Sequence, residues 1–343
     1  MLGEKLIIKL WDSIADKGIG GLLAPWQILR EGDARTEARR REILLLADAE
    51  KKAEEIRKGD AKLIVEKSRT DLLPSGRVKS IETVERIESE VDFQHVIEIA
   101  DSRKRLENVR AEINVAKAII FAEEELVNEQ QSPPDRSIDD DWLFKWHESA
   151  SKVSAEELQQ LWGKVLAGEV KSPGQFSFRT MEFLKNISQE EAQLITKLAQ
   201  FNISGCIARN EQDILVKNGI SFDDLMYLQE LGIVNGVEAI GMSTEFKSTI
   251  ENSFQRALTS NGKALLLLNE DTNKKLSLSS YGLTNLGKQI LTLGKFEFNQ
   301  EYLNSIGKKF AAQGFNVQLG DWTQMDESRG KLSNLVIIKQ GNA

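Results

Sequence analysis

One short segment gathers residue types that act elsewhere as acids, bases or metal ligands. Aspartates fill positions 139–141, and His147 and Glu148 follow. Zinc proteases that bind metal through a helix need two histidines four residues apart, and His147 has no such companion. Carboxylates at the start of a helix also favour its dipole, so a helix that begins here explains the aspartates. We therefore predict no catalytic or metal-binding residue in this segment.

Other catalytic motifs are missing from the sequence. Its single cysteine, Cys206, and its two histidines are too few for an ordinary structural zinc site. No phosphate-binding GxxxxGK[ST] loop occurs, and the glycines at 18–21 follow a predicted helix rather than a strand. We expect no cofactor, and the sequence favours a protein that is not an enzyme. An enzyme whose site assembles from distant residues stays an alternative.

The charges also restrict the classes of partner. Lys and Arg number 45 and Asp and Glu 53, a net charge of −8, which argues against a general nucleic-acid binder. The arginines at 39–41 lie next to Glu37 and Glu42, so a solvated helix face explains them better than a phosphate site. No uncharged apolar stretch is long enough to cross a bilayer. With one free cysteine, we expect a cytoplasmic location.

Changes in composition predict three domains. Residues 1–131 are densely charged, and the turn-forming run Ser-Pro-Pro-Asp follows at 132–135. Residues after 203 are richer in Gly, Asn and Ser. We place the domains at 1–131, 132–202 and 203–343.

The N-terminal residues 4–17 predict a short amphipathic helix. Its apolar face would contact the protein's own core or a neighbouring subunit, or would lie on an anionic surface at the inner face of the cell membrane. Docking on protein is favoured because the polar face mixes acids with lysines. The partner-contacting residues that we predict here are Leu6, Leu10, Trp11, Ile14 and Trp26.

Two long helices, at about 33–67 and about 80–130, predict a helical hairpin. The second helix repeats apolar residues at steps of three and four, the seam of a coiled coil. Its partner is the first helix, another subunit, or both, so we expect an oligomerisation stalk and a homo-oligomer. The seam residues are Leu106, Val109, Ile113, Ala116 and Ile120.

The middle segment, 132–202, predicts a bundle of short helices. Start signals stand at Asp139, at Ser177, and at Ser154 and Ser188, each with a glutamate three residues later. Tryptophans at helical spacing indicate core packing rather than a ligand box. We expect Arg179 to hold the carbonyls of a Pro-Gly turn or to pair with a buried acid such as Glu169. The structural motif comprises Trp142, Trp146, Trp162, Gly168, Pro173, Gly174 and Arg179.

The last segment mixes helices and strands. A helix at 221–231, a hairpin of strands 263–268 and 274–280, and a helix after Thr284 suggest a winged-helix-like unit. A terminal βαβ-type unit follows, with a strand at Phe296 and Phe298, a helix at 299–313, and strands at 315–319 and 335–338. The helix at 221–231 carries three acids and neither Lys nor Arg, so it lacks the groups that read DNA.

The middle motif, together with the opening Gly18-Ile19-Gly20 and Pro25-Trp26-Gln27-Ile28, resembles an uncharacterised bacterial family, domain of unknown function 2806. The resemblance implies a bacterial, cytoplasmic protein and brings no activity. Some uncharacterised families of this kind are encoded near phage-defence genes. Antiviral defence is therefore a biological context that rests on the resemblance alone.

These observations predict a mainly α protein with a small α+β part at the C-terminus. We expect a non-enzymatic, oligomerising interaction or scaffold protein. If its N-terminal helix binds lipid, the protein is peripheral to the inner membrane; if this helix docks on protein, it is free in the cytoplasm. A winged-helix, DNA-linked regulator is the alternative from another class, although we expect no nucleic acid as a partner. The other protein partner is not specified by the sequence.

Overall fold

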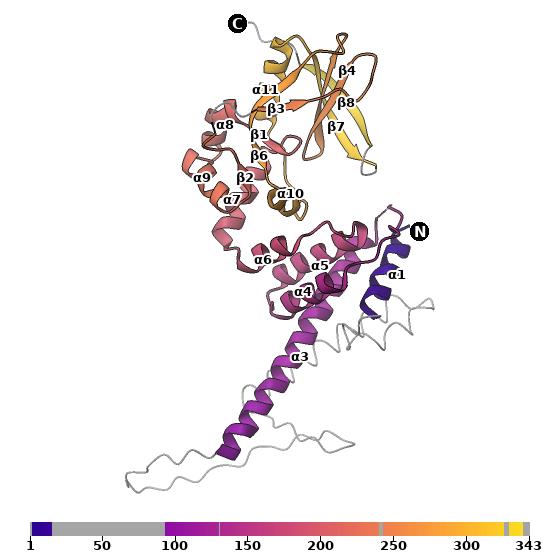
Figure 1. The fold of residues 1–343 in the computed structure, drawn as a ribbon, viewed down its shortest axis with the longest axis vertical. Coiled ribbons are helices and arrows are strands. Elements are labelled where there is room, and N and C mark those ends of the chain that lie inside the picture. The colour runs from indigo at the N-terminus through magenta and orange to yellow at the C-terminus, as the bar shows by residue number, and fades with distance from the viewer. Residues whose placement is uncertain (1, 16–92, 130, 240–242, 326–328, 339–343) are drawn as a thin grey trace. The chain divides into compact units, whose positions relative to one another are not determined.

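The structure is a computed structural model that describes residues 2–15, 93–129, 131–239, 243–325 and 329–338 (Figure 1). The predicted helix at 33–67, the beginning of the second long helix and Trp26 lie outside the described residues. The chain divides into two compact units, Met1–Gly174 and Gln175–Ala343. The described part of the first unit is helical, and the second adds two antiparallel sheets, so the mainly α class with a C-terminal α+β part is confirmed.

In the first unit, the second half of a long helix lies against three shorter ones. The helices are α1 (Leu2–Ala15), α3 (Phe93–Leu126), α4 (Asp140–Ser151) and α5 (Glu156–Lys171). α3 packs mainly on α5 and also on α4, and α1 packs on both α3 and α5. The helices approach closely at Gly163, where an added Cβ would lie 2.6 Å from the Cβ of Phe121. Most of the first unit's core lies where these helices meet.

The start of α5 differs from the prediction. Ser154 does not cap this helix, because the N-cap is Ala155, which makes no side-chain capping bond. The Oγ of Ser154 instead accepts a hydrogen bond from Nε of Arg110 on α3 at 3.1 Å. By contrast, Asp139 caps α4 as predicted, with its carboxylate accepting from the backbone N–H of Trp142 at 3.0 Å.

The second unit begins with helices and a small sheet. The helices are α6 (Phe178–Asn186), α7 (Gln189–Ala199), α8 (Gln212–Lys217), α9 (Phe222–Glu230) and α10 (Asn285–Leu291), with the 3-10 turn η2 (Arg209–Glu211). The strands are β1 (Cys206–Ala208), β2 (Val234–Asn235), β3 (Ser243–Phe246) and β6 (Leu276–Leu283). β6 is central: it pairs with β1 on one side, and β2 and β3 also pair with it, all antiparallel. Ser177, Ser188, Ser221 and Thr284 cap their helices, as predicted.

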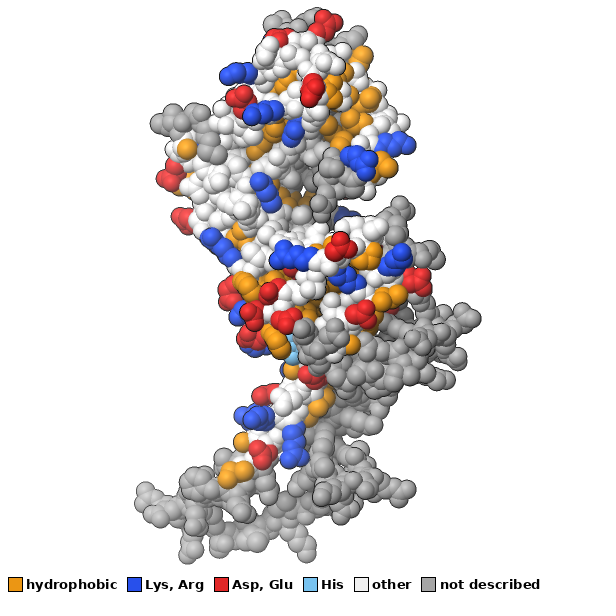
Figure 2. Space-filling model, turned by 45° about the vertical axis from the view of Figure 1, so that its right-hand side comes forward, with side chains coloured by type: hydrophobic (Ala, Val, Ile, Leu, Met, Phe, Trp, Pro, Cys, Tyr) orange, Lys and Arg blue, Asp and Glu red, His pale blue; other side chains and the backbone are white. Residues whose placement is uncertain are grey.

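The second sheet has the order β4-β5-β7-β8 and is also antiparallel. Its strands are β4 (Phe254–Ser260), β5 (Lys263–Asn269), β7 (Asn316–Gln324) and β8 (Gly330–Ile338). Helix α11 (Gln300–Ala312) packs on this sheet. Figure 2 shows hydrophobic side chains exposed in the upper part of its view, which belongs to the second unit.

Two predicted pairings are wrong. The strands at 263–268 and 274–280 do not form a hairpin, because β5 pairs with β4 and β7 while β6 belongs to the first sheet. β5 is a run of leucines with apolar residues on both faces, and such a strand is best placed inside a sheet. The terminal unit is not βαβ, since the described residues Phe296 and Phe298 do not form a strand, and β7 and β8 form an antiparallel pair. Among the described residues, no helix is long and apolar enough to cross a membrane.

Candidate functional site

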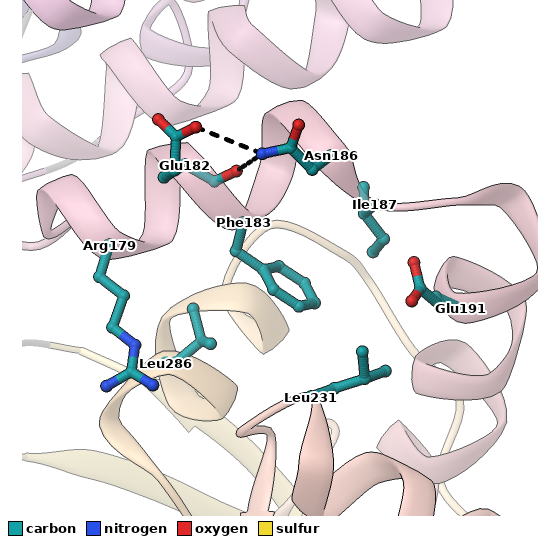
Figure 3. A pocket seen from close by; sticks show the side chains of 8 residues that line it. All are labelled: Arg179, Glu182, Phe183, Asn186, Ile187, Glu191, Leu231 and Leu286. Carbon is teal, nitrogen blue, oxygen red and sulfur yellow. Dashed lines mark hydrogen bonds between the residues drawn. The ribbon is translucent and has the colours of Figure 1, made fainter.

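A groove lies in the second unit (Figure 3). Residues from α6, the start of α7, the end of α9 and α10 line it, around a volume of about 380 Å³. Its apolar lining consists of Phe183, Ile187, Leu231 and Leu286, and its polar lining of Arg179, Glu182, Asn186 and Glu191. The mixture fits a short polypeptide better than a reacting small molecule, because the charged groups do not converge on one point.

The acids of the groove are engaged in local structure. Glu191 accepts from the backbone N–H of Ser188 at 2.7 Å and from the hydroxyl of Tyr227 at 2.8 Å. These two hydrogen bonds lower the pKa of Glu191, and the same carboxylate raises the pKa of Tyr227. Glu182 forms an ion pair with Lys185 at 3.1 Å. The lowered pKa of Glu191 is the opposite of the raised pKa that a general acid needs.

Arg179 has a different place from the one predicted. It is exposed on α6 and lies beside Gly232, within the groove. The Pro-Gly turn is held by other residues: Nη1 of Arg136 donates to the carbonyl of Pro173, and the buried Glu169 accepts from the backbone N–H of Gly174. Gly174 has a φ of +94°, which favours glycine at this position.

The residues around Arg179 hold α10 against α6. Oε1 of Gln289 accepts from the backbone N–H of Ser177 at 3.1 Å, from its hydroxyl at 3.2 Å, and from the hydroxyl of Thr180. Thr180 is buried, so this acceptor satisfies a hydroxyl that water does not reach. The role of Gln289 could not be predicted from the sequence, because nothing near position 289 signals a partner more than a hundred residues earlier.

The tryptophans of the motif are core residues. Trp142, Trp146 and Trp162 are buried, and Nε1 of Trp146 donates to the carbonyl of Trp162 at 2.9 Å. The carbonyl of Gly168 accepts from the backbone N–H of Ser172 at 2.9 Å near the end of α5. These contacts give the motif a packing role in the first unit.

The predicted partner-contacting residues fall into two groups. Most are buried in the first unit, and α1 is held further by Lys9, whose ammonium donates to the carbonyls of Pro134 and Arg136. The face of α1 that would meet a membrane is therefore packed against the protein's own helices. The buried residues are Leu6, Leu10, Trp11, Ile14, Ile113 and Ala116, whereas Leu106 and Ile120 are half-buried and Val109 is exposed.

The acidic segment at 139–148 has ordinary structural partners. Asp139 caps α4, and Glu148 pairs with Lys152 at 2.7 Å and Lys145 at 3.4 Å. Hydrogen bonds and charge from these lysines lower the pKa of Glu148. The described residues contain no group of three or more side chains placed to hold a metal ion.

A second exposed surface lies at the end of the C-terminal sheet. Leu335, Val336 and Ile337 of β8 are consecutive and are 44%, 66% and 63% exposed. β8 pairs with β7 and is the last strand in the sheet order. This apolar edge differs from the groove, since it offers backbone groups as well as side chains.

Comparison with known families identifies part of the chain. The family described as protein of unknown function (DUF2806) matches residues 98–217. This stretch belongs to that family. The DUF2806 stretch begins within α3, ends with α8, and contains every motif residue from Trp142 to Arg179, so the resemblance expected from the sequence is confirmed. No curated protein and no solved structure matches the chain.

Proposed function

We propose that this protein is an oligomerising interaction protein, in agreement with the function expected from its sequence. The observation that carries the proposal is the exposed apolar run at 335–337 on an edge strand. Soluble proteins normally protect such edges, because an unpaired strand with apolar side chains binds other chains. A protein that keeps this edge open has a surface suited to a partner.

The first half of α3 adds support. Ile97, Ile99 and Val109 are more than 40% exposed there, and Val109 belongs to the seam predicted from the sequence. A charged helix with exposed apolar residues gains stability when a second chain packs alongside it. We therefore propose self-association rather than a role as an isolated module.

We propose further that α7 to α10 with the first sheet form a winged-helix-like module used for protein contact. The order α7, β1, α8, α9, β2, β6, with β6 between β1 and β2, supports this proposal, in which α9 would take the position of a recognition helix. The exposed residues of α9 are Phe222, Asp223, Tyr227 and Glu230. Acids on this helix repel phosphate, whereas its aromatic residues suit a protein surface.

The topology also keeps the DNA-linked regulator as the second candidate. A filter-binding titration with duplex DNA at low salt separates the two functions, because phosphate contacts are strongest there. We expect no binding. Salt-sensitive binding that is lost on substituting Lys274 and Lys275 together by Ala would favour the regulator instead.

The main test is the molecular mass of the full chain in solution, measured by light scattering across a wide range of concentration. We expect a dimer or a larger assembly that dissociates on dilution. A monomer at every concentration would contradict the proposal. Comparing bacteria with and without the gene under phage challenge would test the defence context separately.

A further inference from the structure

We infer that β8 pairs antiparallel with β8 of a second copy of this chain, joining two four-stranded sheets into one. The inference rests on the proposed self-association and specifies the surface that carries it. On one side, β8 is occupied by β7, with Val317 opposite Ile338 and Leu319 opposite Val336. Every second residue of an edge strand directs its N–H and C=O away from its neighbour, so the other side of β8 can accept a strand.

The two edges of this sheet are treated differently, which points to β8 as the interface. On β4, the backbone N–H of Gln255 donates to Ser248 Oγ, and the carbonyl of Gln255 accepts from the backbone N–H of Thr249. Likewise, the backbone N–H of Thr259 donates to Ser204 Oγ, and the carbonyl of Thr259 accepts from the backbone N–H of Ser204. Among the described residues, the β8 backbone makes no hydrogen bond outside its ladder with β7. One edge is thus closed within the chain, and the other is open.

The side chains of β8 lack the usual protection of an edge. No charged residue and no proline occurs from Leu332 to Ile338. Edge strands normally carry lysine or proline at such positions to prevent pairing. The ladder shifts register between Val336 and Ser333, so Asn334, which has a φ of 53°, and Leu335 lie at this irregularity, and regular pairing with β7 resumes at Val336. Among the described residues, no strand pairs with the outer side of this run.

A second copy fits this run because the run is complementary to itself. A two-fold axis normal to the sheet places residues from the same face opposite each other. With the axis at Val336, Leu335 lies opposite Ile337 of the second copy and Val336 lies opposite its own equivalent. The pairs are all apolar, and the charged residues that flank the run in the sequence, Lys331 and Lys339, lie outside it. When β8 pairs with its own copy, no like charges lie opposite each other within the run. An unrelated partner would need an apolar strand of the same length.

The test uses opposite charges at the proposed axis. Val336→Lys and Val336→Glu are prepared separately in the full chain, with Val216→Lys on α8 as the matched control. Val216 is 54% exposed in the same unit, so the control adds the same charge away from β8. Far-UV circular dichroism checks that each variant is folded, and light scattering gives its mass.

We expect each Val336 variant to have half the mass of the wild type, and the control to keep the wild-type mass. An equimolar mixture of the two Val336 variants should regain the wild-type mass, because lysine then faces glutamate. If both folded variants keep the wild-type mass, association uses another surface and this inference fails while the proposed function stands. If the mixture stays at half mass, Val336 does not face its own equivalent. A wild type that is always monomeric removes the proposed function itself.

Discussion

Of two apolar runs, one in each unit, the first is buried and the second is exposed. On α3, Ile113, Ala116 and Ile119 are fully or almost fully buried, and α5 is the main helix packed on α3. On β8, Leu335, Val336 and Ile337 remain open at the edge of a sheet. Hydrophobic spacing alone shows that a surface needs a partner. Spacing does not show, however, whether the partner belongs to the same chain.

The two runs differ in how specific their contacts are. Between α3 and α5, a glycine allows close approach, and Nε2 of Gln159 donates to Oδ1 of Asn114 at 3.1 Å in a buried position. Such a polar pair fixes one arrangement of the helices, because leaving either group unpaired would be costly. Among the described residues, the apolar run of β8 has no comparable polar contact, so its specificity must come from the strand ladder and from the match of its apolar side chains.

The largest effect is expected where α1 packs on the interior. Leu10 is fully buried, and Leu10→Ala should lower the free energy of unfolding by about 2–5 kcal/mol through lost contacts and a cavity. Ile8, on the same helix, is 55% exposed, and Ile8→Ala should change it by less than about 0.5 kcal/mol. Urea unfolding followed by circular dichroism measures both. Equal effects would mean that α1 is not docked on its own chain.

The next effect concerns the close approach of α3 and α5. Gly163→Ala would place a methyl group 2.9 Å from the carbonyl oxygen of Ala118 as well as against Phe121. Alanine gains about 1 kcal/mol in helix propensity, but overpacking against backbone costs about 1–3 kcal/mol, so we expect net destabilisation. Tryptophan fluorescence during urea unfolding reports on this core. The exposed Gln160→Ala serves as control, and a more stable Gly163→Ala protein would disprove the tight contact.

A comparable loss is expected at Gln289, which ties α10 to α6. Gln289→Leu removes the acceptor for the buried hydroxyl of Thr180 and should cost about 1–3 kcal/mol. Gln289→Glu keeps accepting oxygens and should lose less. Hydrogen exchange of α6 and α10 locates the effect. Unchanged protection in the leucine variant would show that this acceptor is not needed.

The smallest effect is expected on β8. Ile337→Thr should alter the stability of the dilute, dissociated protein by less than about 0.5 kcal/mol, because the side chain is already exposed. The same change should weaken association, measured as a shift of the mass-versus-concentration curve to higher concentration. A large loss of stability on dilution would place Ile337 in an interior rather than at an interface.

The sequence predicted best what depends on neighbouring residues. Helix starts at Asp139, Ser177, Ser188 and Ser221 follow from a side chain that reaches the backbone three residues ahead, and each was confirmed. At α5 the rule failed, because Ser154 found a partner on α3 instead of its own helix.

Contacts between distant residues were less accessible. The strands at 263–268 and 274–280 were identified as strands, but adjacency wrongly suggested that they pair. Similarly, the turn at Pro173 is held by Arg136, and the role given to Arg179 came from its nearness in sequence alone. The groove and the open edge depend on how whole elements assemble, which local patterns do not encode.

The excursion of β4 and β5 between β3 and β6 has a consequence for biosynthesis. β5 leaves the ribosome with only one of its two neighbours, since β7 is translated after β6, α10 and α11. The leucines of β5 cannot be covered by β7 until that later strand has been synthesised, and pairing between strands so far apart in sequence slows folding. Until β7 is made, β5 lacks this neighbour, and its leucines are open to mispairing with other chains.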